Sequence, residues 1–507
     1  MKNINKNGDP IGYAAIIERC NLSVIPHFRS SYIALQGGRK VIRSKKTTDY
    51  IYDKNYALDP GAGLLEHIAF ALKHEGLNLE IIKACLEHIK PSEVEKYVLS
   101  QPAGKYARMI WYLYESFTGA VLRIPDLEQG SYVPLLNPKD YYTSKPIKKQ
   151  RYRIHDNLLG NFTWCPFVRR TPMLEQYENK QLDKKAQAVL KKYPHNIQER
   201  AASYMYIKET RSSYALEHEQ PTQSRMQNFI KLLINADMIE HLNKPILVEL
   251  QNNIVEPRFA NNDYRSTQNY VGEGGVTGNQ IIHYISPKPK DVPLLMEGLL
   301  AAMDRMVASE VSPVIIAATV SFGFVYIHPF DDGNGRLHRF IIHYLLRITQ
   351  FIQSNTIIPI SATMLDDRTS YDDALECFSK PLLQVLSDYA IDSSGKLLVR
   401  PDTLGYYQYI DCTAIAEYLF ECLETTINTQ LPKELLFLVS YDKTKSALQN
   451  IVDMPDNKID LFIALAVQNK GHIAASKRSN IFFMLTDREV SDMEHVVQKQ
   501  MAHLLKD

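Results

Sequence analysis

The chain lacks an excess of charge of either sign. Its 58 Lys and Arg residues stand against 57 Asp and Glu residues, which leaves a formal net charge of +1. Proteins that bind nucleic acid or anionic membranes through their overall field carry a large basic excess. We therefore expect no nucleic-acid partner and no partner that is selected by overall charge.

Paired cysteines and an apolar leader are also missing. No two cysteines are spaced as CxxC, and none joins histidines in a pattern typical of zinc sites. Unpaired, buried thiols are typical of a reducing compartment. The first nine residues are polar, so we expect no secretory signal and a cytoplasmic location. The six cysteines are Cys20, Cys85, Cys165, Cys377, Cys412 and Cys422.

Only one segment lacks charged residues over a length that could cross a membrane. Residues 311–330 contain no Asp, Glu, Lys or Arg, and a membrane span needs about 20 apolar residues. The segment nevertheless holds polar or helix-breaking residues throughout, which favours a buried central helix over a span. These residues are Ser312, Pro313, Thr319, Ser321, Gly323, Tyr326, His328 and Pro329.

The remaining pattern predicts a mainly α-helical protein without repeats or low-complexity tracts. We expect a helical domain at residues 1–180, a central domain at 181–400 and a helical domain at 401–507. For the last of these, a winged-helix-like module remains an open alternative. A glycine-rich turn between β-forming residues predicts a hairpin or flap at about 268–286.

The densest set of chemical groups lies at residues 328–339. Pro329 should end the buried helix and leave His328 at its C-terminus. Gly333 and Gly335 let consecutive amide N–H groups point into one cavity at the start of the next helix, where phosphate binds well, and Asn334 adds a side-chain donor. The sequence is His328-Pro329-Phe330-Asp331-Asp332-Gly333-Asn334-Gly335-Arg336-Leu337-His338-Arg339.

The charged residues of this motif suit chemistry on a nucleotide. Arg336 and Arg339 lie three residues apart, on one helix face, and can clamp phosphate oxygens. Asp332 can bind Mg²⁺, and His328 can take a proton from an attacking hydroxyl near neutral pH. Each residue alone has an ordinary structural explanation, but their combination in twelve residues favours a functional site.

The twelve residues resemble the motif of the Fic family, His-Pro-Phe-x-Asp/Glu-Gly-Asn-Gly-Arg-x-x-Arg, at every fixed position. The resemblance implies a Fic-type helical core and a protein adenylyltransferase that moves AMP from ATP, with Mg²⁺, to a Ser, Thr or Tyr hydroxyl. It implies that His328 is the base, Asp332 the metal ligand and Arg339 the partner of the γ-phosphate. Gly333, Asn334, Gly335 and Arg336 would then hold the α- and β-phosphates.

The resemblance also implies a docking site and a means of self-inhibition. The segment at 268–286 looks like the family's flap, which binds the target protein by strand addition. In self-restraining members a helix carries Ser/Thr-x-x-x-Glu-Gly/Asn, and Ser213 and Glu217 fit this pattern at about 195–219. His218 departs from it. Glu217 would pair with Arg339 and remove the arginine that the γ-phosphate needs.

Other functions remain open. The same site could remove AMP from a protein or use another nucleotide-linked donor. The family's phosphate-transferring relatives have Ala and Lys where this chain has Gly333 and Gly335–Arg336, which disfavours that reaction. A DNA- or protein-binding module with a remnant Fic core is the non-enzymatic alternative, and self-modification and a homodimer stay open.

Overall fold

The computed structural model describes residues 8–35, 38–44, 47–274, 280–353, 356–393 and 395–505. Contacts divide the chain into two compact units, each built from three segments. The first unit comprises Met1–Gln176, Asn235–Phe351 and Asp367–Phe420, and the second comprises Tyr177–Ile234, Ile352–Asp366 and Glu421–Asp507. The motif thus belongs to the first unit.

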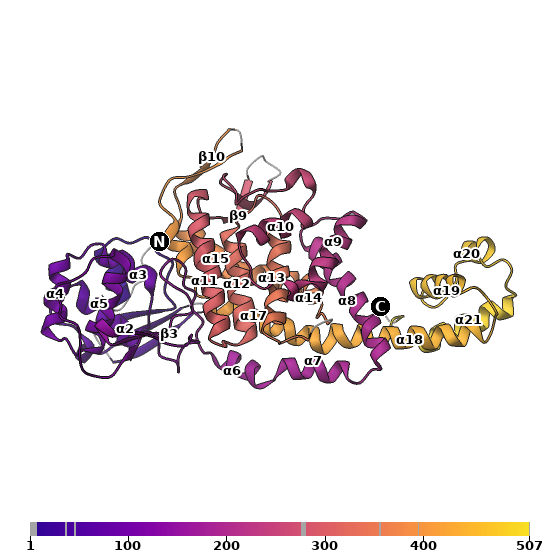
Figure 1. Ribbon diagram of the computed structural model, residues 1–507, viewed down its shortest axis with the longest axis horizontal. Coiled ribbons are helices and arrows are strands. Elements are labelled where there is room, and N and C mark those ends of the chain that lie inside the picture. Colours follow the sequence, from indigo (N-terminus) through magenta and orange to yellow (C-terminus); the bar gives the residue numbers. More distant parts are fainter. Residues whose placement is uncertain are drawn as a thin grey trace. The chain divides into compact units, whose positions relative to one another are not determined.

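Helices dominate the chain, as the sequence predicted (Figure 1). The helices of the first unit are α1 (Tyr13–Arg19), α2 (Leu64–His74), α3 (Leu79–Leu86), α4 (Pro91–Ser100), α5 (Lys105–Thr118), α10 (Lys244–Ile254), α11 (Val292–Ala308), α12 (Pro313–Ile327), α13 (Asn334–Ile348), α15 (Arg368–Val385) and α16 (Leu404–Gln408). The chain passes between the units within α6 (Pro172–Asn179) and α17 (Thr413–Thr425). No described helix combines the length and apolar character that a membrane crossing needs.

Small sheets in the first unit were not predicted, apart from the hairpin of β8 (Tyr270–Gly274) and β9 (Gln280–Ile285). The N-terminal sheet has the order β1-β2-β4-β3, with β2 and β4 parallel. Parallel pairing joins distant residues and leaves no local turn signal. The other strands are β1 (Gly8–Ile11), β2 (Arg29–Ala34), β3 (Lys40–Arg43), β4 (Thr48–Tyr52), β5 (Val133–Pro134), β6 (Ile147–Lys149), β7 (Ile154–Asp156), β10 (Tyr389–Ile391) and β11 (Leu397–Val399).

Helices α12 and α13 pack against each other in the first unit (Figure 1). Helix α12 begins with Pro313 at its first position, where the fixed φ of proline favours the helix. Nearly all side chains of α12 are buried. The predicted buried helix is therefore present at 313–327. Helix α13 is buried on almost every side, beyond the apolar stripe that its sequence predicts, and its buried residues include Arg336 and Arg339.

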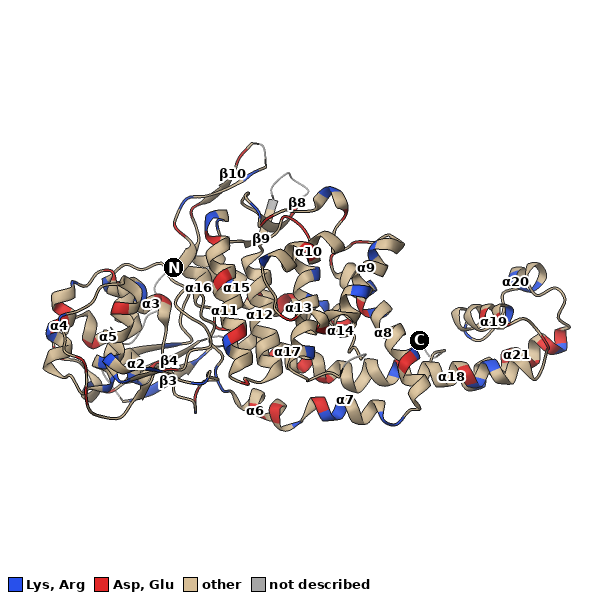
Figure 2. Cartoon of the chain, in the orientation of Figure 1, with Lys and Arg blue, Asp and Glu red and all other residues tan. Residues whose placement is uncertain are grey.

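The second unit is helical throughout its described residues. Its helices are α7 (Leu182–Leu190), α8 (His195–Leu216), α9 (Gln223–Ile234), α14 (Ile360–Asp366), α18 (Leu431–Gln449), α19 (Asp456–Gln468), α20 (Ala475–Asn480) and α21 (Asp487–Gln500). Acidic and basic residues are interspersed along α18 and α21 (Figure 2). No described strand follows β11, which favours the plain helical alternative for the C-terminal part over a winged helix.

Within the second unit, α8 packs against α14 and α18. Lys208 of α8 forms an ion pair with Glu434 of α18, with 2.7 Å between Nζ and Oε1. The buried Glu209 accepts a hydrogen bond of 2.9 Å from the backbone N–H of Ser361 in α14. Two segments that lie far from α8 in the sequence therefore hold it in place.

Candidate active site

The motif forms the loop between α12 and α13. His328 ends α12 in the left-handed region, at φ 52°, and the following Pro329 has no N–H to continue the helix. Phe330 is fully buried and meets the ring of Tyr264 edge-on, with 5.7 Å between the centroids. Phe330 therefore anchors this loop in the core.

One ring nitrogen of His328 is held by the helix that precedes it. Nδ1 lies 3.1 Å from the carbonyl oxygen of Val325. Because a carbonyl oxygen can only accept, this contact puts the proton of the neutral imidazole on Nδ1 and the lone pair on Nε2. In that tautomer Nε2 is the nitrogen that can take a proton from a hydroxyl.

Asp332 and Arg336 interact directly at the start of α13. Arg336 Nη2 donates to Asp332 Oδ1 at 2.6 Å, and the N–H of Gly333 donates to the same oxygen at 2.6 Å. The second oxygen of Asp332 has no hydrogen-bond donor among the described residues, and this side chain is 36% exposed. Arg339 lies about one turn further along α13 and is buried.

The turn before α13 favours glycine at position 333 for two reasons, its backbone conformation and the lack of space for a side chain. Its φ is +90°, and a Cβ here would lie 2.8 Å from Val255 Cγ1. The N–H groups of the next residues, Asn334, Gly335 and Arg336, belong to the first turn of α13, where helix geometry leaves them without an intrahelical acceptor. Amides in this position at a helix N-terminus are able to bind an anion.

The side chain of Asn334 has a second task in the loop. Its Nδ2 donates to the carbonyl oxygen of Phe330 at 2.8 Å, and its Oδ1 accepts from the N–H of Phe330 at 3.0 Å. Both polar atoms therefore brace the turn in this structure. The prediction that Asn334 donates to a phosphate stays a prediction.

Arg265 is a buried residue of this region that the sequence analysis missed. Its Nε donates to the carbonyl oxygen of His328 at 2.7 Å, and its backbone N–H donates to that of Pro329 at 2.8 Å. Its Nη1 and Nη2 donate to the carbonyl oxygens of Thr267 and Pro287 at 2.8 and 2.6 Å. One guanidinium thus ties the histidine loop to the segments on both sides of the β8–β9 hairpin. Burial lowers the pKa of Arg265 to about 10, so the group stays charged at neutral pH.

Three further residues that the sequence did not predict form hydrogen bonds to Asp331 and Asp332 of the loop. The buried Gln251 donates from Nε2 to the carbonyl oxygen of Asp332 at 3.1 Å. Asn261 and Thr267 donate to the two carboxylate oxygens of Asp331, at 3.0 and 3.1 Å. No sequence pattern singled out these residues, because isolated Gln, Asn and Thr residues are common in turns and helices.

The segment predicted as a flap contains the antiparallel pair β8 and β9, with a register shift between Val271 and Gly272. Residues 275–279, at the tip of this segment, lie outside the described residues. The sheet has two strands, so the outer backbone edge of each strand is open to a further strand within the described part of the chain. Val271 and Ile281 are 45% and 56% exposed.

The two residues predicted to regulate the site lie in the second unit. Ser213 is buried in α8, and Glu217 is the exposed C-cap of that helix. The next residue, His218, adopts a φ of 56°. The N–H groups of His218 and Glu219 donate to the carbonyl oxygens of Ala215 and Tyr214, both at 3.0 Å. This is the Schellman arrangement, so His218 adopts the backbone conformation for which Gly or Asn is suited.

Asp332 is the residue of the motif that was predicted to bind a hard cation together with phosphates. No group of three or more His, Cys, Asp or Glu side chains among the described residues could hold a metal alone. Mg²⁺ typically binds one or two carboxylates together with substrate phosphates and water. The second oxygen of Asp332, beside the N-terminus of α13, fits that requirement.

Comparisons with known proteins agree with the motif. The model of the Fic/DOC family matches residues 233–346. Over 118 residues, the chain is 31% identical to the protein adenylyltransferase Fic of Drosophila grimshawi and 32% identical to that of Drosophila melanogaster. Each match covers 22% of this chain and 22% of the relative.

Solved structures of Fic proteins align more loosely with the chain. A Fic domain containing signaling protein from Bacteroides thetaiotaomicron is 19% identical, covers 50% of this chain and 96% of that one, and has a TM-score of 0.35. Fic-1 from C. elegans is 12% identical, covers 73% of this chain and 94% of that one, and has a TM-score of 0.31. The family match, rather than these alignments, shows that the chain contains a domain of the Fic/DOC family at residues 233–346.

Proposed function

We propose that the chain is a protein adenylyltransferase that transfers AMP from ATP to a hydroxyl group of a protein. The observation that carries this proposal is the complete motif on one loop, with His328 held by Val325 in the tautomer of a general base. The names of the Drosophila relatives support the same reaction, although the chain spans only 22% of their length.

In the proposed reaction, the hydroxyl oxygen of a Ser, Thr or Tyr side chain forms a bond to the α-phosphorus of ATP. The bond between that phosphorus and the oxygen bridging to the β-phosphate breaks, and pyrophosphate leaves. The hydroxyl proton moves to Nε2 of His328. The amides at the start of α13, with Arg336 and Arg339, stabilise the phosphate oxygens. When bound beside Asp332, Mg²⁺ supplies charge neutralisation for the leaving group.

The test uses ATP labelled at the α- or the γ-phosphate. Label from α-labelled ATP, and none from γ-labelled ATP, should appear on protein. His328→Ala should reduce this labelling by at least about 100-fold, because general-base catalysis contributes about 10²–10⁴-fold. His88→Ala, which changes an exposed histidine of the same unit, should leave it unchanged. Transfer of γ-label, or full labelling by His328→Ala, would refute the proposal.

We also propose that Glu217 restrains this activity. The support is the Ser213 and Glu217 pattern at the end of α8, together with the Schellman geometry of His218 and Glu219. A carboxylate that pairs with Arg339 would compete with the γ-phosphate for that guanidinium. ATP would then bind in an unproductive position.

Two neighbouring glutamates offer a matched test of this restraint. Glu217→Ala should increase labelling several-fold, whereas Glu219→Ala removes the same charge two residues away and should not. Glu219 forms an ion pair with Arg225 at 2.9 Å, so its carboxylate has a partner in the segment that follows α8. Equal labelling by both variants and the unchanged chain would end the proposal of self-inhibition.

The flap is the proposed docking site for the target protein. An extended target segment would pair with the open edge of the β8–β9 hairpin, and backbone hydrogen bonds would set its register. The exposed Val271 and Ile281 offer apolar contacts to its side chains. Arg265 connects this hairpin to the carbonyl of His328, so docking would bring the hydroxyl group toward the base.

A further inference from the structure

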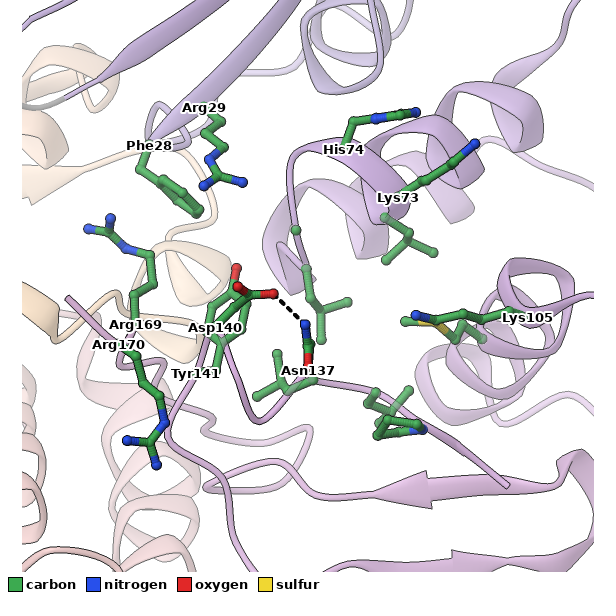
Figure 3. Close-up of a pocket in the computed structure, with 17 residues that line it drawn as sticks. Phe28, Arg29, Lys73, His74, Lys105, Asn137, Asp140, Tyr141, Arg169 and Arg170 are labelled. Atoms are coloured by element: carbon green, nitrogen blue, oxygen red, sulfur yellow. Dashed lines mark hydrogen bonds between the residues drawn. The ribbon is translucent and has the colours of Figure 1, made fainter. Parts of the chain in front are cut away.

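A cavity of about 180 Å³ lies in the N-terminal part of the first unit, among residues that precede the Fic/DOC domain (Figure 3). Its charged lining residues are mostly basic, with Asp140 as the acidic one. A concave surface with charges of one sign concentrates the electrostatic field and attracts counter-ions. The basic residues are Arg29, Lys73, Lys105, Arg169 and Arg170.

Two of the arginines are already held by the protein. Arg169 donates from Nε to Asp411 at 3.1 Å, and its guanidinium lies 4.2 Å from the ring centre of Phe28. Arg170 donates from Nε to the carbonyl oxygen of Pro138 at 2.9 Å. These contacts fix the two side chains as parts of the cavity wall.

The other three cations have no such partner. In the described part of the chain, no acceptor forms a hydrogen bond or an ion pair with the side chains of Arg29, Lys73 or Lys105. The half-buried guanidinium of Arg29 lies 5.2 Å from the ring centre of Phe28 and 5.7 Å from that of Tyr50. Aromatic contacts on a planar guanidinium restrict its motion and leave its edge N–H groups available to an anion. Figure 3 shows Arg29 and Lys105 extending from opposite sides of the cavity.

Nearby acidic groups neutralise little of this charge. Asp140 is exposed and accepts a hydrogen bond of 2.6 Å from Asn137. The carboxyl group of Glu75, at the C-terminal end of α2, accepts from the N–H of Tyr13 at 2.7 Å. Burial raises the pKa of Glu75 to about 7, so at neutral pH it is only partly ionised. The cavity therefore keeps an excess of positive charge.

We propose that this cavity binds the phosphate monoester group of a small molecule. A phosphate monoester carries about two negative charges and three acceptor oxygens, which match several donors on different walls. The rings of Phe28 and Tyr141 line the same cavity and can contact the organic part of the ligand. Drug-sized ligands occupy pockets of about 300–1,000 Å³, so the volume suits a compact ligand. The site is independent of the proposed adenylyl transfer.

The test is calorimetric titration of the full chain at low salt with inorganic phosphate and phenyl phosphate. Arg29→Gln and Lys105→Gln should each weaken phenyl phosphate binding about tenfold or more, because each loses a charge-assisted hydrogen bond. Lys139→Gln removes the same charge from an exposed residue that does not line the cavity, and should have no effect. Arg29→Lys keeps the charge and should bind with intermediate affinity, which guards against a folding defect.

Three outcomes would overturn the proposal. The first is no binding of phenyl phosphate at millimolar concentration, and the second is equal weakening by Lys139→Gln. The third is that a single-stranded 20-mer oligonucleotide binds more tightly than phenyl phosphate, with or without a 5′-phosphate, and that Arg29→Gln abolishes its binding. This result would assign the surface to nucleic acid. Binding of ATP at the motif is followed in every variant and should not change, so failure at this cavity is distinguishable from failure at the motif.

Discussion

Arg265 joins the histidine loop to the flap through a single buried side chain, which is 3% exposed. Its three nitrogen atoms donate to three carbonyl oxygens on different segments. The ammonium group of lysine offers its donors from one point and cannot reach all three. The position of the His328 backbone therefore depends on a planar guanidinium.

We expect Arg265→Lys to lower adenylyl transfer about 10- to 100-fold, because a displacement of about 1 Å at reacting groups can cost 10²-fold. The loss should fall on kcat, with little change in the KM for ATP, if Arg265 acts as a positioning residue. Steady-state kinetics with labelled ATP measure both. Arg258→Lys, at an exposed arginine paired with Glu256, is the control. A loss confined to thermal stability would contradict the positioning role.

Glu75 makes the stability of the N-terminal region depend on pH. Burial raises its pKa to about 7, above the value of about 4.3 for an unfolded chain. Folding therefore favours the protonated form. Its contribution to stability is complete below about pH 4.3 and is lost as pH rises through 7.

We expect the urea concentration at the unfolding midpoint of the first unit to decrease as the pH rises from 5 to 8. Glu75→Gln should make this decrease smaller. The full effect of this one group is at most about 4 kcal/mol, since its pKa differs by roughly 2.7 units between the two states and each unit corresponds to about 1.4 kcal/mol. Glu80, whose pKa burial raises to about 8, contributes in the same direction. Unfolding at several pH values, with the exposed Glu87→Gln as control, measures the change. Identical slopes for Glu75→Gln and the unchanged chain would contradict the assignment.

At the scale of elements, the hairpin of β8 and β9 depends on Gly272. A Cβ at this residue would lie 2.4 Å from the backbone oxygen of Ile281, and a backbone atom cannot move aside as a side chain can. The register shift occurs at the same place. A glycine at such a shift in an antiparallel pair is typical of a close backbone approach.

We expect Gly272→Ala to displace the hairpin and to lower transfer to other proteins at least about tenfold, while ATP binding stays within about twofold, because loss of register removes backbone pairing with the target. Labelling of lysate proteins and calorimetry with ATP measure the two effects. Gly61→Ala, where a Cβ would meet no atom within 4 Å, is the matched control. Normal transfer by Gly272→Ala would remove the flap from the proposed docking site.

The elements around the motif follow from local sequence, whereas the small sheets do not. The ends of α12 and α13 are set by Pro313, Pro329 and Gly333, because proline and glycine determine the backbone conformation at their own positions. The strand β5 has two residues, Val133 and Pro134, which carry no periodic pattern. Its partner β7 pairs with it in parallel and follows about 20 residues later.

In the candidate site, too, some residues were predicted from the sequence and others were found only in the structure. The motif predicted His328, Asp332 and Arg336, because their types and spacing are themselves the signal. Arg265 and Gln251 act through contacts with backbone carbonyls of distant residues. A single sequence contains no local pattern for such contacts, so only the structure identifies them.

At the scale of the whole molecule, the second unit combines three segments of the chain. The sequence predicted consecutive domains, since composition changes along the chain reveal linkers but not which helices return to pack together. Helix α8 depends on α18, where Leu435 is fully buried and its neighbour Leu436 is 42% exposed. These two leucines allow a matched comparison.

We expect Leu435→Asp to destabilise the second unit by about 3–5 kcal/mol, because it removes a buried leucine and introduces an unpaired charge. Leu436→Asp should change stability by less than about 0.5 kcal/mol, as exposed substitutions do. Limited proteolysis followed by mass spectrometry should show new cleavage within residues 177–234 in the first variant only. Equal protection of that segment in both variants would contradict the packing of α8 on α18.

Because the second unit is built from three segments of the chain, it is completed only after the motif has been synthesised, and this order matters for the cell. The ribosome makes α8, then the whole motif, and only afterwards residues 421–507, which contain α18, one of the helices that pack against α8. At about 5–20 residues per second, this last segment follows several seconds later. Truncated translation products that end near residue 420 would carry every residue of the motif but lack α18, one of the supports of the helix that bears the proposed restraint. Their removal would then protect other proteins from less regulated modification.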